Sequence, residues 1–403
     1  MSGAVIDPRL ANKRAAPRKR LQLSWSDPSF RNLVWQVLIV GLVIAIVWYL
    51  VSNTNRNLEA RRIATGFGFL GRTAGIPIGE YLIPYDPSIN TYATALFIGV
   101  LNTLKVAVVG IVLATILGTV IGIARLSRNW LVGRISAIYV EVVRDIPVLL
   151  QLLFWYALLQ SMPAPRQSFH PLPGLFFSNR GVKFPLLDWV SADWWVLLAF
   201  AIGLLGTWAW ARTCTRRQEA TGVRPPVWPA ALGLLVVFPL IVWAALGAPF
   251  VPDVPELRGF NYIGGATISP EYGALTLGLV VYTAAYIAEI VRSGIQAVAT
   301  GQWEAAGALG LRQGVVLRRI VLPQALRVII PPMTSQFLNL TKNSSLAVAI
   351  GYQDIVSIAS TTLNQTGQAI EGIAMIMLVY LVISLSISLF MNWYNARIAL
   401  VER

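Results

Sequence analysis

The segment "EAAGALGLRQGVVLRRIVLP", residues 304–323, decides how this chain is interpreted. It opens with a glutamate and two alanines, carries three glycines and three arginines, and closes on Pro323. The stretches that flank it are strongly apolar. What such a segment does depends on those stretches and on the side of the membrane that it faces.

The composition is that of an integral membrane protein. Of 403 residues, 56% are hydrophobic and only 12% are charged, which lies well outside the usual range of soluble domains. The net charge is +14, but the basic residues are scattered between apolar stretches, which favours contact with membrane lipid over nucleic-acid binding. Cys214 is the only cysteine and His170 the only histidine. We therefore expect no intramolecular disulfide, no metal site and no catalytic residue of either type.

Apolar runs predict an all-α fold with about eight transmembrane helices, because a hydrocarbon core about 30 Å thick requires roughly 20 apolar residues per helix. Two of the runs have polar interruptions: 135–160 contains Glu141, Arg144 and Asp145, and 326–350 contains Pro331, Pro332 and Lys342. Both are predicted to be helical, since irregular backbone exposed to lipid leaves polar groups unsatisfied. The six clearer spans are 33–51, 94–124, 194–211, 227–248, 273–291 and 371–392.

The distribution of lysine and arginine predicts that both chain ends are cytoplasmic. In this orientation most of these residues fall in cytoplasmic segments, while Lys105, Arg144 and Lys342 lie within spans. The transmembrane domain, 94–392, includes an inserted helical hairpin, 194–248, and a cytoplasmic loop, 292–325, which holds the segment quoted above. The remaining parts are a basic N-terminus (1–32), a first transmembrane helix (33–51), an outer segment (52–93) and a cytoplasmic tail (393–403).

Local chemistry predicts a short helix in this loop, from about Gln302 to Leu309. Thr300 or Gly301 is suited to cap its start, Glu304 complements the helix dipole in the first turn, and Gly310 ends the helix. The alanines give it faces with little side-chain relief, which suits insertion into a groove of another protein. On composition alone, a basic loop that happens to be helical remains an equal alternative.

The loop resembles the EAA motif of binding-protein-dependent ABC importer permeases. The family pattern E-A-A-x3-G-x9-I-x-L-P is matched by Glu304, Ala305, Ala306, Gly310, Ile320, Leu322 and Pro323, and Gly307 follows the alanines directly. In that family this loop is the coupling helix, which docks into a cleft of a cytoplasmic ATPase. The resemblance thus implies a type I ABC permease core with an added N-terminal helix and an inserted hairpin.

Further stretches resemble the permeases of polar amino-acid importers. Among them are "YTAAYIAEIVRSGIQAV" from Tyr282 and "NSSLAVAIGYQDI" from Asn343. "GFNYIGGATISPEY" from Gly259 and the extra spans look like the permease of the general L-amino-acid system of alphaproteobacteria. The implied location is the bacterial inner membrane, and the implied substrates are L-amino acids.

The same resemblance implies several partners: a second permease chain in a heterodimer, two copies of an ABC ATPase, and a periplasmic binding protein that delivers the amino acid. The chain contains no G-x4-G-K-[ST] phosphate loop. ATP and Mg²⁺ are therefore expected on the partner ATPase, with no cofactor bound by this chain, which is not itself an enzyme.

A polar tract in the span 326–350 is the candidate for the substrate pathway. Its residues are Asn339, Thr341, Lys342, Asn343, Ser344 and Ser345, in a span that Pro331 and Pro332 are expected to bend. The alternative is structural: Lys342 snorkels or pairs with an acid, and the other side chains hydrogen-bond between helices. For Glu141, Arg144 and Asp145, a functional role and an ion-pair cluster at the inner membrane boundary are equal alternatives. Glu289 and Arg292, near the cytoplasmic end of their helix, are interpreted as a structural pair.

Two other classes of protein remain open at this stage. An ion-coupled secondary amino-acid transporter explains the spans and the intramembrane charges, but it does not explain the EAA spacing. A membrane scaffold that transports nothing also fits the hydropathy.

Overall fold

The computed structural model describes residues 25, 28–60, 65–187, 193–223, 225–247 and 252–398. The chain divides into two units, of which the first contains α1 (Pro28–Ala60) and the second contains nearly all the other elements. α1 is apolar and exposed to its surroundings along its length, and it extends beyond both ends of the predicted span 33–51. Most of the predicted N-terminal segment 1–32, and the end of the tail 393–403, lie outside the described residues.

Within the described residues, six helices are long and apolar enough to cross a membrane. Counting each of two sharply bent helix pairs as one further span gives eight. This confirms the prediction of a helical membrane protein. One of the six is α1, and four others are α2 (Tyr92–Ala124), α5 (Asp193–Thr221), α8 (Pro270–Gln296) and α13 (Ala369–Ile398). The sixth is a continuous run made of α6 (Trp228–Leu232), a π-helical turn (Gly233–Val237) and α7 (Phe238–Ala245).

The first bent pair contradicts the prediction of one helix over 135–160. α3 (Trp130–Asp145) and α4 (Val148–Gln160) meet at an angle of 104°. Pro147 causes the break, because a residue that precedes proline avoids the helical region, and Ile146 is accordingly extended. The Gln151 amide donates to the freed carbonyl oxygens of Val143 and Ile146, at 2.8 and 3.0 Å.

The second bent pair has its break just beyond the predicted span 326–350. α11 (Leu322–Asn343) contains Pro331 and Pro332 and is nevertheless one helix; it continues as a 3-10 helix (Ser344–Ile350). The break lies further on, at Gly351 with its positive φ, and is followed at 52° by α12 (Ile355–Thr366). α12 was not predicted. Its buried residues follow helical spacing, Ile355, Ile358, Ala359 and Thr362, but the helix is too short for a search based on spans.

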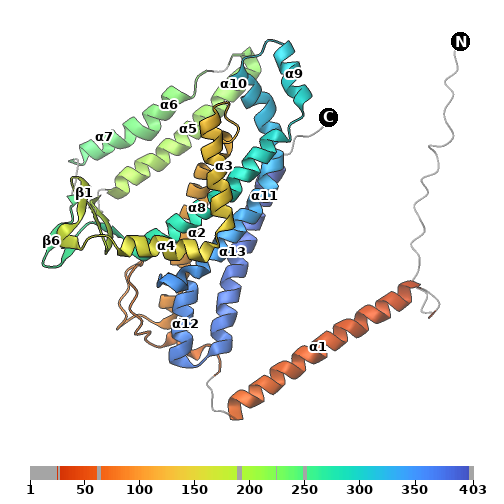
Figure 1. Cartoon of the computed structure of the whole chain (residues 1–403), viewed down its shortest axis with the longest axis vertical. Helices are drawn as coiled ribbons and strands as arrows, with labels where there is room; N and C mark the ends of the chain where they lie inside the picture. Colours follow the sequence, from red (N-terminus) through yellow and green to blue (C-terminus); the bar gives the residue numbers. More distant parts are fainter. Residues whose placement is uncertain are drawn as a thin grey trace. The chain divides into compact units, whose positions relative to one another are not determined.

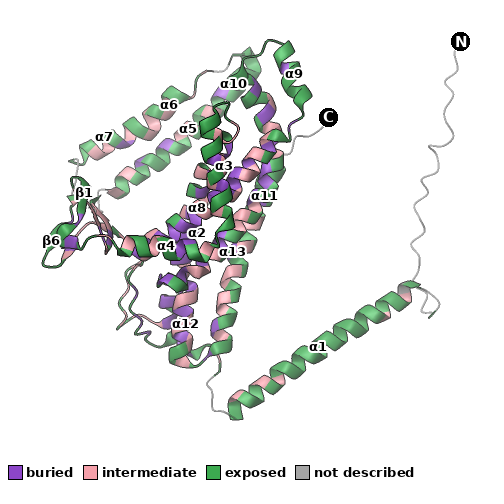
Figure 2. Ribbon diagram, viewed as in Figure 1, coloured by how far each residue is buried: buried purple, intermediate pink, exposed green. Residues whose placement is uncertain are grey.

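α2 and α8 form the centre of the bundle, packed through small residues. A side-chain carbon on Gly118 would lie 2.8 Å from the Ala284 carbonyl oxygen, and one on Gly122 would lie 2.7 Å from that of Ala288. Glycines one turn apart thus let the two backbones approach closely, as is typical of packed transmembrane helices. Figure 2 shows this buried centre and the largely exposed helices α5 to α7.

Three small sheets, absent from the prediction, flank the hairpin of α5 with α6 and α7. The largest has the strand order β1-β2-β3-β8. In a second sheet, β4, which precedes the hairpin, pairs with β5, which follows it, so that the two ends of the hairpin lie side by side. Because each strand has at most four residues, no run of alternating polarity is long enough to predict it. The strands are β1 (Phe169–Leu172), β2 (Leu175–Ser178), β3 (Gly181–Phe184), β4 (Leu186–Leu187), β5 (Pro252–Asp253), β6 (Glu256–Arg258), β7 (Asn261–Ile263) and β8 (Ala266–Ile268).

Short helices occupy the segment between α8 and α11. They are α9 (Thr300–Ala308), α10 (Gln313–Val316) and a π-helical turn (Leu317–Val321). Figure 1 shows α9 and α10 at one end of the bundle and α12 at the other. Two 3-10 helices, Phe67–Gly71 and Pro165–Gln167, complete the elements of the described residues.

Candidate functional site

α9 is the helix predicted in the loop, shifted by one or two residues. It spans Thr300–Ala308 instead of 302–309, and Ala299 precedes it without a side-chain cap, so the prediction of a Thr300 or Gly301 cap is wrong. Its end is as predicted: Gly310 has φ +65°, a conformation that glycine adopts without strain. The Gly310 and Leu311 amides donate to the carbonyl oxygens of Gly307 and Ala306, at 2.9 and 3.2 Å. This paired closure fixes the direction in which the chain leaves α9.

The EAA residues divide into an anchored part and an exposed part. Ala306 is buried and belongs to the same apolar cluster as Val316 and Val321, with Ile320 partly buried against it. The exposed residues of the motif are Glu304, Ala305, Gly307, Gly310 and Leu322, while Pro323 is half-buried in the first turn of α11. Figure 2 shows α9 as an almost wholly exposed helix. The motif therefore holds one face of α9 on the bundle and leaves the other free.

An ion-pair cluster ties the helix that precedes α9 to the centre of the bundle. The carboxylate of Glu289 accepts from Arg292, as predicted, and also from Arg125 at the end of α2. Arg292 donates in addition to Gln296, at 2.6 Å. The coupling segment thus leaves α8 from a rigid base.

The structure contradicts the ion-pair alternative for the group at the end of α3. Glu141, Arg144 and Asp145 are all exposed, and none of them belongs to an ion pair among the residues that the structure describes. Arg144 lies instead over the ring of Tyr286, 5.0 Å from its centroid.

The polar tract, which runs from the end of α11 into the 3-10 helix that follows it, faces two ways. Thr341 and Ser344 are buried, and their hydroxyls donate to the backbone carbonyl oxygens of Phe337 and Thr341. These two contacts are structural. Asn339 and Lys342 are exposed, three residues apart on one helix face, and Asn343 and Ser345 are half-buried. Within the described part of the chain, Lys342 makes no ion pair.

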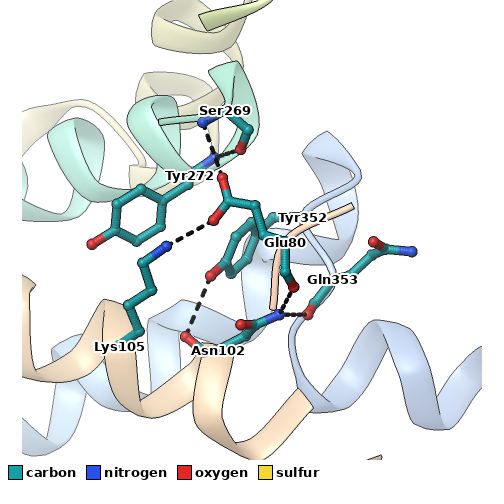
Figure 3. Close-up of polar contacts among 7 residues, drawn as sticks. All are labelled: Glu80, Asn102, Lys105, Ser269, Tyr272, Tyr352 and Gln353. Atoms are coloured by element: carbon teal, nitrogen blue, oxygen red, sulfur yellow. Dashed lines mark hydrogen bonds and ion pairs between the residues drawn. The ribbon is translucent and has the colours of Figure 1, made fainter. Parts of the chain in front are cut away.

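A second polar site, not predicted, lies where α2, α8 and the turn before α12 meet (Figure 3). The Lys105 ammonium lies 2.8 Å from Glu80 Oε2 and 4.0 Å from the centroid of the Tyr272 ring. Glu80 Oε1 accepts from the amide of Ser269, the residue that caps α8, at 3.0 Å. The pair therefore bridges α2, the first turn of α8 and the segment that precedes α2.

Backbone contacts complete this site. Asn102, one turn before Lys105, donates its amide to the carbonyl oxygens of Glu80 and Gln353, at 3.0 and 2.9 Å. The Gln353 side chain in turn accepts from the Gly79 amide and donates to the Pro77 carbonyl oxygen, both at 2.6 Å. Lys105 was recognised in the sequence only as a charge within a span. Its partner, 25 residues away in an irregular segment, has no signature in local spacing.

Comparison with known proteins defines the class. The family model described as "Binding-protein-dependent transport system inner membrane component" matches residues 225–400, which include α9, α11 and α13. With the apolar helices, this match defines a multi-pass membrane component of a transport system.

Full-length relatives define the family. Over 94% of its length the chain is 49% identical to the general L-amino acid transport system permease protein AapQ of Rhizobium johnstonii, covering 94% of that protein. It is 50% identical to the amino-acid ABC transporter permease protein YhdX of Escherichia coli, over 94% of this chain and 97% of that one. The chain is 42% identical to the glutamate/glutamine/aspartate/asparagine transport system permease protein BztB of Rhodobacter capsulatus, over 95% of this chain and 97% of that one. The chain belongs to the permease subunits of amino-acid ABC transporters. It is thus not an enzyme, and the ion-coupled alternative is wrong.

Proposed function

We propose that this chain forms one half of the membrane pathway of an L-amino-acid importer in the bacterial inner membrane. The observation that carries the proposal is α9, a helix anchored through Ala306 and otherwise exposed, at the end of the bundle expected to face the cytoplasm. Such a surface of small residues suits a cleft of an ATPase. A second, different permease chain, two ATPase copies and a periplasmic binding protein complete the proposed transporter.

The described contacts offer a route for coupling. ATP and Mg²⁺ bind to the ATPases, whose closure moves the docked α9. Ala306 belongs to the same apolar cluster as Val316 and Val321, and Val321 directly precedes α11, so a displacement of α9 can be passed to α11 through this cluster. The exposed face of α11 carries Asn339 and Lys342. ATP binding therefore repositions the proposed pathway residues without any contact between nucleotide and substrate.

Co-purification tests the proposed assembly. We expect the tagged chain to bring down an ABC ATPase and a different permease, and the cells to take up amino acids only while ATP is available. Uptake that survives ATP depletion as long as an ion gradient persists contradicts the proposal. If deletion of the chain leaves uptake unchanged, the chain is a scaffold and not part of the pathway.

Introduced cysteines test the proposed orientation. Cys214 itself is buried, so it is replaced by serine, and a single cysteine is placed at Val223 or at Phe260, which are 71% and 73% exposed. In intact cells with a permeable outer membrane, a membrane-impermeant maleimide is expected to label Cys at 260 and to label Cys at 223 only after the inner membrane is opened. The reverse pattern places both ends of the chain outside.

A further inference from the structure

We propose that Lys105 is a binding point for the carboxylate of the amino-acid substrate, and that Glu80 is a built-in carboxylate that occupies this point until substrate arrives. The inference rests on the proposed function, because it takes the α12 end of the bundle as the outer mouth of the pathway. It adds a site, a ligand group and a way of keeping the mouth closed.

The geometry of Lys105 suits a carboxylate. Its ammonium has one oxygen of Glu80 at 2.8 Å and rests over the Tyr272 ring, which leaves an ammonium further donors for other acceptors. The Lys105 side chain keeps 26% of its surface exposed, more than the 15% of Glu80. A solute therefore reaches the lysine more readily than it reaches the glutamate.

Asn102 supplies a matching acceptor for the other end of an amino acid. This residue is fully buried, and its Oδ1 has no hydrogen-bond partner among the described residues. Buried acceptors without a partner are rare and point to a ligand or a water. Because Asn102 and Lys105 are three residues apart on α2, they lie on one helix face. Glu80 contacts both residues, so its departure would offer an acceptor and a donor that are complementary to the ammonium and the carboxylate of an α-amino acid.

Glu80 lies on a segment whose start is anchored by the buried side chains of Ile76 and Ile78, and whose largely exposed middle, 79–82, is held by a few polar contacts. We call residues 76–83 the strap. Its contacts to the rest of this site are those of Gly79 and Pro77 with Gln353, and of Glu80 with Asn102, Lys105 and Ser269. Gln353 belongs to the turn that joins the α11 extension to α12, so a movement of α11 also loosens the strap.

Exchange of one carboxylate for another explains why the mouth opens for substrate. Parting Glu80 from Lys105 without a replacement leaves a charge unpaired in a partly buried place, which is costly. A substrate carboxylate keeps Lys105 paired while Glu80 moves into water with the exposed middle of the strap, 79–82. A solute without a carboxylate offers no such replacement. The exchange therefore admits amino acids and opposes leakage of other solutes.

Four variants test the exchange: Glu80→Gln, Lys105→Met, the charge swap Glu80→Lys with Lys105→Glu, and a control with Glu256→Gln and Arg258→Met, which removes the exposed pair of β6. We expect Lys105→Met to lower uptake by about tenfold or more, and the control to leave it unchanged. The swap restores an ion pair, and hence membrane abundance, but uptake stays low because Glu at 105 repels the substrate carboxylate. If the swap restores uptake, the pair is only structural and the proposal fails.

A thiol on the strap gives a readout that does not depend on transport. Gly79 accepts a cysteine, since an added side-chain carbon meets only Gln353 Oε1, at 3.7 Å. In the purified complex, with Cys214 replaced by serine, maleimide labelling at position 79 is expected to rise with Glu80→Gln. It also rises when an amino acid transported by the wild type is added, but not when the carboxamide of that amino acid is added. Equal labelling in all these conditions overturns the proposal, whereas failure of the wild type to take up any amino acid contradicts the proposed function instead.

Discussion

A Gly310→Val variant is expected to insert in the membrane at normal abundance and to have lost amino-acid uptake. Gly310 adopts φ +65°, where a residue with a side chain pays roughly 1–2 kcal/mol and a β-branched one more. The strain falls on the hydrogen bond from the Leu311 amide to the Ala306 carbonyl oxygen, which sets the direction of the chain at the end of α9. An added side-chain carbon at Gly310 meets no atom within 4 Å, so the bundle itself is not disturbed. The loss is therefore expected at the ATPase and not in folding.

The matched control is Gly222→Val. Gly222 also has a positive φ, +74°, and also has open space around it, but it follows α5 in the loop of the hairpin. This variant carries the same backbone strain and should transport normally.

Glu304→Lys offers a second change in α9, because it reverses an exposed charge on the docking helix without altering the backbone; it too should abolish uptake. The assignment of α9 as the coupling helix is wrong if Gly310→Val or Glu304→Lys transports at the wild-type rate. Uptake is measured together with membrane abundance and with ATPase co-purification.

A Lys342→Met variant is expected to lose uptake of acidic, neutral and basic amino acids alike, by about tenfold or more. Methionine keeps most of the length of the side chain and removes the charge. We propose that the Lys342 ammonium binds the carboxylate common to all amino acids after it has left Lys105, while Asn339, Asn343 and Ser345 contribute hydrogen bonds. A hydrogen bond to a charged group is worth roughly 1.5–3 kcal/mol, and about 1.4 kcal/mol corresponds to a factor of ten. Assembly and nucleotide binding by the complex should be retained.

Three outcomes separate the possible roles of Lys342. Loss of protein or of the complex indicates a structural lysine, an unchanged rate indicates a lysine that only reaches the membrane surface, and loss of acidic substrates alone refutes recognition of the shared carboxylate. Lys183→Met, in strand β3 of the small sheet, controls for removal of a lysine elsewhere. Uptake and abundance are measured on the same membranes.

The long apolar runs made the spans predictable, because about 20 apolar residues in sequence have few alternatives to a membrane helix. The errors lie where a single residue or a short segment decides the geometry. Pro147 turns the predicted span 135–160 by 104°, a signal that was present in the sequence and was outweighed by hydropathy. α12 and the small strands are shorter than the roughly 20 apolar residues that mark a membrane span, so hydropathy does not indicate them.

The candidate site divides in a similar way. The EAA residues share one local segment with a fixed spacing, and their helix and its glycine end could be predicted to within two residues. The sequence located the tract from Asn339 to Ser345, but it did not predict which side chains are buried. Thr341 and Ser344 are buried, whereas Lys342 is exposed. The pairing of Glu80 with Lys105 depends on the tertiary fold, which places an irregular segment across α2 and α8.

The two-stranded stem under the hairpin bears on how such permeases diversify. Leu187 pairs with Pro252, so the chain leaves the core and returns to it at neighbouring positions, about 5 Å apart as in any pair of strands. A tight turn spans the same gap. Replacing the intervening residues, 188–251, by such a turn is therefore expected to leave the positions of α4 and α8 unchanged. The replaced part contains two helices that are each long and apolar enough to cross a membrane, so removing both leaves the membrane orientation of all later helices the same.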